Sequence, residues 1–127
     1  MNIQKFTQKS IEAVNDCEKL AYEYGNQEIE QEHLLVALLR QEDGLILKLI
    51  EKMEIQKEHF MENAMQYLNA RVKVSGGQVY IGKNLNQALI SAEDEARQMG
   101  DEYVSVEHLF LSLLKYPNQA MKAIFKE

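Results

Sequence analysis

The chain contains very little of several residue types that usually shape or stabilise a fold. Its 127 residues include one cysteine, one proline and no tryptophan. A single cysteine, Cys17, cannot form an internal disulfide, so we expect a reducing compartment. No stretch approaches the roughly 20 apolar residues that cross a bilayer, and the N-terminus has no continuous apolar segment typical of a secretion signal. These absences predict a cytoplasmic protein without a membrane span.

Positive charge is also scarce. The chain has 14 Lys and Arg residues against 20 Asp and Glu residues, a formal net charge of -6. An acidic chain is poorly suited to bind a phosphate backbone, so we expect no nucleic-acid partner. The hydrophobic content of 46% is enough for the core of one domain. Leu, Ala, Glu, Lys and Gln abound, and these residues favour helix. The composition therefore predicts an all-α domain.

The spacing of apolar residues predicts helices in both halves of the chain. Residues 31–40 have almost no polar face, so we expect that helix to be central and buried. Residues 71–83 include a Gly-Gly pair and show no helical period, which predicts a partly extended linker. Asn84 is expected to cap the helix that follows. The expected helices are 7–24, 31–40, 45–53, 57–70, 84–99, 106–115 and a last one around 120–125.

One short phrase occurs twice, 75 residues apart. Glu32-His33-Leu34-Leu35 returns as Glu107-His108-Leu109-Phe110. Sliding residues 6–52 onto 81–127 needs no gap and gives nine identical positions. We infer one domain over residues 1–127 built from two pseudo-symmetric repeats of a four-helix unit, 1–70 and 84–127, joined by the Gly-containing linker 71–83. The second copy stops after its third helix, so either it is truncated or a final helix lies beyond residue 127.

The stretch from Gly77 to Lys83 spells G-x-x-x-x-G-K, the start of a phosphate-binding loop. Such a loop needs Ser or Thr after the lysine to hold Mg²⁺, and Asn84 stands there instead. It also needs small residues, whereas this loop holds Val79, Tyr80 and Ile81. A linker with two glycines is the better interpretation, and we expect no nucleotide site.

The repeated Glu-His pairs could be read as a four-ligand metal cluster. Adjacent residues on a helix diverge by about 100°, so neither pair can easily chelate one ion. Helix-start chemistry is the better interpretation, because a glutamate in the first turn interacts favourably with the helix dipole. Cys17 lies on the apolar stripe of its helix, and Ala92 stands at the equivalent place, which predicts a small core residue rather than a nucleophile. We therefore expect no catalytic and no metal site.

Four phrases resemble a known family, the N-terminal domain of the Clp ATPases. They are GNQEIEQEHLLVALL, QEDGLILKLIEKM, VSGGQVYIGKNLNQAL and GDEYVSVEHLFLSLLK. The resemblance covers essentially the whole chain. The linker phrase VSGGQVY is similar to the ClpB-type AAA+ disaggregase chaperones rather than to ClpC or ClpA.

The resemblance implies a module that binds unfolded or aggregated polypeptides and helps deliver them to the pore of an AAA+ hexamer. ATP and Mg²⁺ would act in the AAA+ domains, which this chain lacks, so the resemblance implies no enzyme activity and no cofactor in this domain. It implies the AAA+ domains and, through other domains, a DnaK-type chaperone as partners. The alternative is adaptor docking or recognition of phosphoarginine tags, as in ClpC-type unfoldases, through Glu32 and Glu107. Gly82 stands opposite Thr7 in the repeat, so two such sites would differ.

The resemblance implies that Thr7, Asp101 and Glu107 stand at positions that take part in substrate handling in the family. Their structural alternatives are a helix N-cap for Thr7, a turn residue for Asp101 and a dipole partner for Glu107. The family's apolar groove matches Leu85 and Leu89, whereas other groove positions are polar here (Ser91, Glu95 and His108). The expected substrate-binding residues are Thr7, Asp101, Glu107, Glu32, Leu85 and Leu89.

Overall fold

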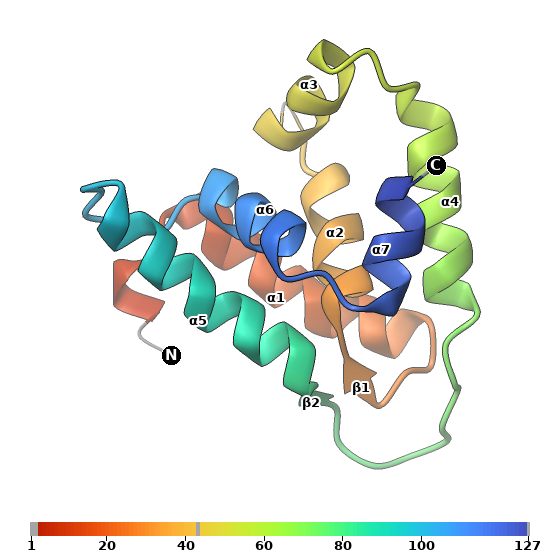
Figure 1. Cartoon of the computed structure of the whole chain (residues 1–127). Helices are drawn as coiled ribbons and strands as arrows, with labels where there is room; N and C mark the ends of the chain where they lie inside the picture. The colour runs from red at the N-terminus through yellow and green to blue at the C-terminus, as the bar shows by residue number, and fades with distance from the viewer. Residues whose placement is uncertain (1–2, 43, 127) are drawn as a thin grey trace.

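Helices make up most of the molecule, as Figure 1 shows. The computed structural model describes residues 3–42 and 44–126. The all-α prediction is confirmed, with two very short strands as the exception. In chain order the elements are the 3₁₀ turn η1 Ile3–Lys5, α1 Gln8–Glu23, β1 Glu28–Ile29, α2 Gln31–Leu39, α3 Leu45–Lys52, α4 Lys57–Asn69, β2 Tyr80–Ile81, α5 Lys83–Gln98, α6 Val106–Lys115 and α7 Gln119–Lys126.

Helix α1 begins and ends where the local sequence predicts. Thr7 is its N-cap, and the Thr7 hydroxyl accepts a hydrogen bond from the backbone N–H of Ser10 at 3.3 Å. At the other end Gly25 adopts a φ of 70°, a left-handed conformation that glycine adopts without steric cost. Local chemistry is therefore sufficient to define this helix.

Helix α2 is the centre of the core. All nine of its residues are buried, and it packs against α1, α4 and α6. Fully burying each of its leucines is worth roughly 1.5–3 kcal/mol, so this short helix holds much of the packing together. The prediction of a central, buried helix is confirmed.

The start of helix α5 differs from the prediction. Asn84 is not the N-cap, because α5 begins at Lys83 and Gly82 is the cap residue, without a capping side chain. The carboxylate of Glu30 instead accepts the backbone N–H of Asn84 at 3.0 Å. The prediction was wrong because this group lies 54 residues away in sequence and leaves no local signal.

The linker is held against the first repeat by backbone hydrogen bonds. Strand β2 pairs in parallel with β1, with Glu28 opposite Tyr80 and Ile29 opposite Ile81. Nearer the start of the linker, the Val74 N–H donates to the Gly25 carbonyl at 2.9 Å. The linker crosses from α4 to α5 along the bottom of Figure 1.

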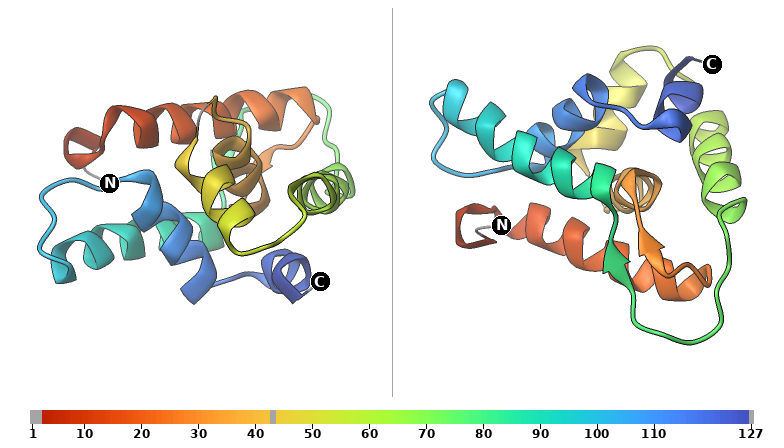
Figure 2. Two further views of the ribbon diagram at one scale, coloured as in Figure 1. Left: turned by 90° about the horizontal axis from the view of Figure 1, so that it is seen from above. Right: turned by 60° about the horizontal axis from the view of Figure 1, so that its bottom comes forward.

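Equivalent residues of the two repeats form equivalent contacts with the other repeat. The Gly82 N–H donates to the Ile29 carbonyl at 2.8 Å, and the Thr7 N–H donates to the Val104 carbonyl at 2.9 Å. Each residue of the second bond lies 75 positions from its counterpart in the first. Helix α3 likewise packs on α6 of the other repeat, while α7 packs on α2. The right-hand view of Figure 2 shows α5 of the second repeat alongside α1 of the first. The repeats interlock around one continuous core rather than forming two separate bundles.

Candidate functional site

The repeated Glu-His phrase builds the start of each central helix. The Glu30 N–H donates to His33 Nδ1 at 2.9 Å, and the Ser105 N–H donates to His108 Nδ1 at 2.9 Å. Because Nδ1 accepts in both cases, Nε2 carries the proton. His33 Nε2 then donates to Asn26 Oδ1 at 2.9 Å, and His108 Nε2 donates to Asp101 Oδ2 at 2.8 Å. Each histidine thus ties its helix start to the preceding loop.

This geometry leaves neither histidine free to bind a metal. Both ring nitrogens of His33 and His108 are hydrogen-bonded within the chain. Across residues 3–42 and 44–126, no group of three or more His, Cys, Asp or Glu side chains could hold a metal ion. Burial, with a further contribution from Arg71, lowers the pKa of His33 to about 4. His33 therefore remains a neutral structural group at physiological pH.

Glu32 lies inside the molecule. Its Oε2 accepts from Arg71 Nη1 at 2.7 Å, and its Oε1 accepts from Asn118 Nδ2 at 2.9 Å. Arg71 belongs to the linker and Asn118 precedes α7, so this carboxylate joins three parts of the chain. With its side chain 3% exposed, Glu32 has no oxygen directed at an outside ligand in this structure.

Thr7 and Glu107 are 100 residues apart in the sequence but lie close together in the structure. Both line a hollow of about 460 Å³ that we call the helix-start pocket, because the first residues of α1 and α6 form it. Glu107 is exposed and Thr7 half-buried. The residues lining the pocket are Thr7, Gln8, Lys9, Gln41, Gly44, Leu45, Ser105, Val106 and Glu107.

Two residues that line this pocket differ between the repeats. In the first repeat the Gln31 amide donates to the Asn84 and Tyr116 carbonyls, at 3.1 and 3.0 Å, while Glu30 caps α5. At the equivalent places in the second repeat stand Val106 and Ser105. Neither side chain can form that polar network, and Glu107 is exposed whereas its counterpart Glu32 is buried by its pairing with Arg71 and Asn118.

Asp101 lies near this pocket but does not line it. It contacts His108, the neighbour of Glu107 on α6, and about half of its side chain is exposed. Its carboxylate therefore orients the start of α6 and still faces solvent. Thr7 donates its backbone N–H to Val104, three residues after Asp101, so Thr7, Glu107 and Asp101 all lie around the start of α6.

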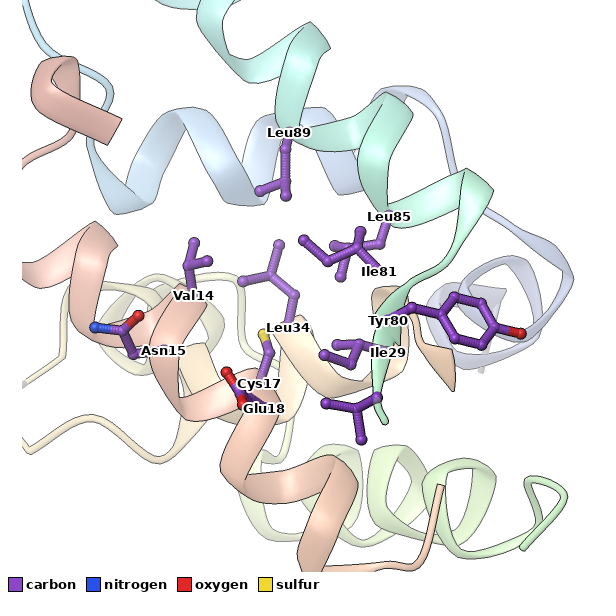
Figure 3. A pocket seen from close by; sticks show the side chains of 11 residues that line it. Val14, Asn15, Cys17, Glu18, Ile29, Leu34, Tyr80, Ile81, Leu85 and Leu89 are labelled. Carbon is purple, nitrogen blue, oxygen red and sulfur yellow. The ribbon is translucent and has the colours of Figure 1, made fainter. Parts of the chain in front are cut away.

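Leu85 and Leu89 line a second hollow, of about 210 Å³, which we call the seam pocket because α1 of one repeat and α5 of the other form its walls. Val14 and Leu89 point toward each other across it, and Ile81 and Leu85 lie beside them (Figure 3). The lining residues are Val14, Asn15, Cys17, Glu18, Ile29, Leu34, Val79, Tyr80, Ile81, Leu85 and Leu89.

The polar groove positions do not line the seam pocket. Glu95 is buried and accepts from Lys115 Nζ at 2.8 Å, His108 holds the start of α6, and Ser91 is half-buried elsewhere on α5. Cys17 lies at the pocket floor, where burial and the adjacent Asp16 carboxylate raise its pKa. Its thiol therefore stays protonated and contributes apolar surface.

Sequence reasoning missed Val14 and Ile81 as pocket residues. Val14 lies 75 positions before Leu89, so the repeat alignment already placed the two at equivalent positions. Residues close to a pseudo-twofold axis meet their own counterparts. That alignment could have identified Val14, whereas Ile81 depended on the unforeseen pairing of β2 with β1.

The stretch resembling a phosphate-binding loop has a different structure. Tyr80 and Ile81 pair with β1, and the Glu30 carboxylate already occupies the start of α5, where a phosphate would lie.

Among the described helices, none combines the length and the apolar character needed to cross a bilayer.

Comparison with known proteins identifies the family. Residues 5–127 match the family described as Clp repeat (R) N-terminal domain. The chain is 45% identical over 122 residues to the chaperone protein ClpB of Nitratidesulfovibrio vulgaris, covering 92% of this chain and 14% of that protein. It is 36% identical over 129 residues to ClpB of Clostridium tetani, covering 98% and 15%. The chain thus spans about one seventh of the length of these relatives.

Solved structures share the fold. The Hsp104 N-terminal domain from Candida albicans superposes with a TM-score of 0.87 at 23% identity, covering 96% of this chain and 80% of that one. The N-terminal domain of ClpV1 ATPase from E. coli superposes with a TM-score of 0.84 at 19% identity, covering 98% and 79%. The matched region is the N-terminal domain rather than the ATPase part, so this chain is not itself catalytic. The chain belongs to the Clp N-terminal domain family.

Proposed function

We propose that this chain is the substrate-binding N-terminal module of a cytoplasmic, ClpB-type, ATP-dependent disaggregase. It recognises exposed segments of unfolded or aggregated polypeptides and helps deliver them to the pore of the AAA+ hexamer. ATP and Mg²⁺ act in the AAA+ domains, and a DnaK-type chaperone is a partner through other domains of the full-length protein. The proposal draws on the ClpB relatives and on two accessible hollows of this domain.

The seam pocket is the observation that carries the proposal. Its walls are mainly apolar, and its one charged lining residue is the exposed Glu18. Unfolded segments expose apolar side chains that such a hollow can take from water. Leu85 and Leu89 form its α5 wall, and we propose Thr7, Glu107 and Asp101 as a second, polar contact.

We propose that Glu32 affects substrate binding only indirectly, because its carboxylate is already paired with Arg71 and Asn118. A domain that binds phosphoarginine through both Glu32 and Glu107 would need a free carboxylate at each of these positions. We therefore do not extend the proposal to that ligand.

Nuclear magnetic resonance tests the proposal. Titrating the ¹⁵N-labelled protein with a permanently unfolded protein should shift the amide signals of residues around the seam pocket. Ile81→Asp, at a pocket residue that is 42% exposed, should weaken binding roughly tenfold, since it places a charge where apolar contact is needed. Met53→Asp is the matched control, because Met53, the residue that follows α3, is an exposed apolar residue outside this pocket. Unchanged binding by Ile81→Asp would refute the proposal.

A further inference from the structure

Strand β2 has an open edge beside the seam pocket. The Tyr80 N–H donates to the Gln27 carbonyl at 2.9 Å, and the Gly82 N–H donates to the Ile29 carbonyl at 2.8 Å. Both bonds point toward β1. Successive backbone groups of a strand point to opposite sides, so the N–H and C=O of Ile81 point away from β1. Within the part of the chain that the structure describes, no hydrogen bond to either group is seen.

The side chains of β2 alternate in a way that suits this edge. Ile81 lies with Leu85 and Leu89 at the pocket, whereas the Tyr80 ring points away from it (Figure 3). A strand added beside Ile81 would therefore direct one side chain toward the pocket and its neighbours toward solvent. The backbone edge and the apolar hollow lie side by side.

The other repeat shows what fills the equivalent place. Phe6 is the counterpart of Ile81, and it forms the bridge with Val104 that matches the pairing of Ile81 with Ile29. Phe6 is 4% exposed, whereas Ile81 is 42% exposed. The first repeat thus closes this position with its own aromatic side chain, while the second leaves it uncovered.

The charge beside the edge favours one kind of occupant. Glu18 is the only charged residue among those lining the seam pocket, it is exposed, and no ion pair to it is seen among the described residues. The whole chain carries a net charge of -6. A basic residue next to the buried apolar side chain would complement this carboxylate.

We propose that the seam pocket takes its substrate as an added β-strand. An extended polypeptide segment pairs with the Ile81 N–H and C=O, inserts one apolar side chain among Val14, Leu85 and Leu89, and presents a Lys or Arg to Glu18. This inference rests on the proposed function and specifies the conformation and chemistry of the substrate. Backbone pairing provides affinity for many sequences, and one side-chain pocket provides a weak preference.

N-methylation of a probe peptide tests the backbone pairing. The probe is a short acetylated and amidated peptide in which Val and Leu alternate with Lys and Thr. Methylating a peptide N–H that faces Ile81 should weaken binding about tenfold, while methylating the next N–H along should have little effect. The expected result, measured by calorimetry, is a loss of affinity at the N–H that faces Ile81 and little change at its two neighbours. The protein itself is unchanged in this experiment, so folding does not affect the result.

A pair of variants tests the same bond from the side of the protein. Ile81→Pro removes the outward N–H, whereas Ile81→Ala shortens the side chain and keeps the N–H. The bonds from Tyr80 and Gly82 to β1 remain possible in both variants, and proline is tolerated where its nitrogen faces outward at an edge. Ile81→Pro should bind the probe about tenfold more weakly than Ile81→Ala. Glu18→Gln should weaken binding of the Lys-containing probe and not of a probe with Thr in place of Lys.

The outcomes separate this inference from the proposed function. If the unfolded protein binds at the seam pocket while every N-methyl position has the same effect, the added strand is refuted and the function stands. Failure of the probe to bind where the unfolded protein binds also refutes the added strand. If the unfolded protein does not bind, or binds unaffected by Ile81→Asp, the proposed function itself fails.

Discussion

His33 and His108 occupy equivalent positions but face different partners. His33 donates to the neutral amide of Asn26, whereas His108 donates to the carboxylate of Asp101. The carboxylate places a negative charge beside the ring of His108, whereas the ring of His33 has an uncharged partner. One residue difference between the repeats thus gives the same helix-start motif two electrostatic environments.

Acidification should destabilise the protein through His33. Burial, together with Arg71, lowers the pKa of His33 to about 4, compared with 6.5 for an unperturbed histidine. Between these two values the unfolded state binds more protons than the folded state, so the free energy of unfolding falls as the pH falls. Lowering the pH from 7 to 5 should cost about 2 kcal/mol from this group alone, measured by urea unfolding.

Glu30 offsets part of that loss. Burial raises the pKa of Glu30, so its protonation on acidification favours the folded state. Direct titration of the His33 ring by nuclear magnetic resonance separates the two effects. Asn26→Asp, which copies the partner of His108, should raise the pKa of His33. A wild-type His33 that titrates near 6.5 in the folded protein would contradict the prediction.

The residues that sequence patterns identified are those whose environment is local. Thr7 as an N-cap and Gly25 at a helix end follow from neighbours within a few positions, and the burial of Cys17 follows from a helical stripe. The pairing of Glu32 with Arg71 joins residues 39 apart in sequence. Such pairs depend on how elements pack, so the internal role of Glu32 could not be predicted.

Among the elements, the starts of α2 and α5 are coupled. One oxygen of Glu30 accepts from Gln31 N–H at 3.0 Å at the start of α2, and the other accepts from Asn84 N–H at 3.0 Å at the start of α5. A single carboxylate therefore satisfies unpaired N–H groups of two helices from different repeats. In the second repeat Ser105 replaces it, and the helix-start pocket is open there.

Removing this double cap should destabilise the fold. Glu30→Ala loses two charge-assisted hydrogen bonds at helix starts, which should lower the free energy of unfolding by about 1–3 kcal/mol. Glu30→Gln keeps one acceptor oxygen and should lose less. Urea unfolding at neutral pH measures both. Glu42→Ala, at an exposed glutamate with no ion pair among the described contacts, should change stability by less than about 0.5 kcal/mol. Equal losses in all three variants would contradict the coupling.

At the scale of the whole molecule, the repeats are joined by a polar cluster as well as by the core. Arg71 of the linker pairs with Glu28 before α2 and with Glu32 on α2, both at 2.7 Å. Asn118, which precedes α7, donates to the same Glu32. The linker, the central helix and the last described helix therefore meet at one buried carboxylate, which fixes their relative positions.

Removing Arg71 alone should lower the free energy of unfolding more than removing the charges of Arg71 and Glu32 together. Arg71→Met leaves Glu32 buried without its cation, which should lower the free energy of unfolding by about 3–5 kcal/mol. Combining Arg71→Met with Glu32→Gln removes the unpaired charge and keeps an acceptor for Asn118, so the double variant should be more stable than Arg71→Met alone. A double-mutant cycle by urea unfolding measures the difference. Glu28 is 41% exposed, so Glu28→Gln is the control and should cost at most about 1 kcal/mol. Additive losses in the cycle would show that Glu32 and Arg71 act independently, contrary to their geometry.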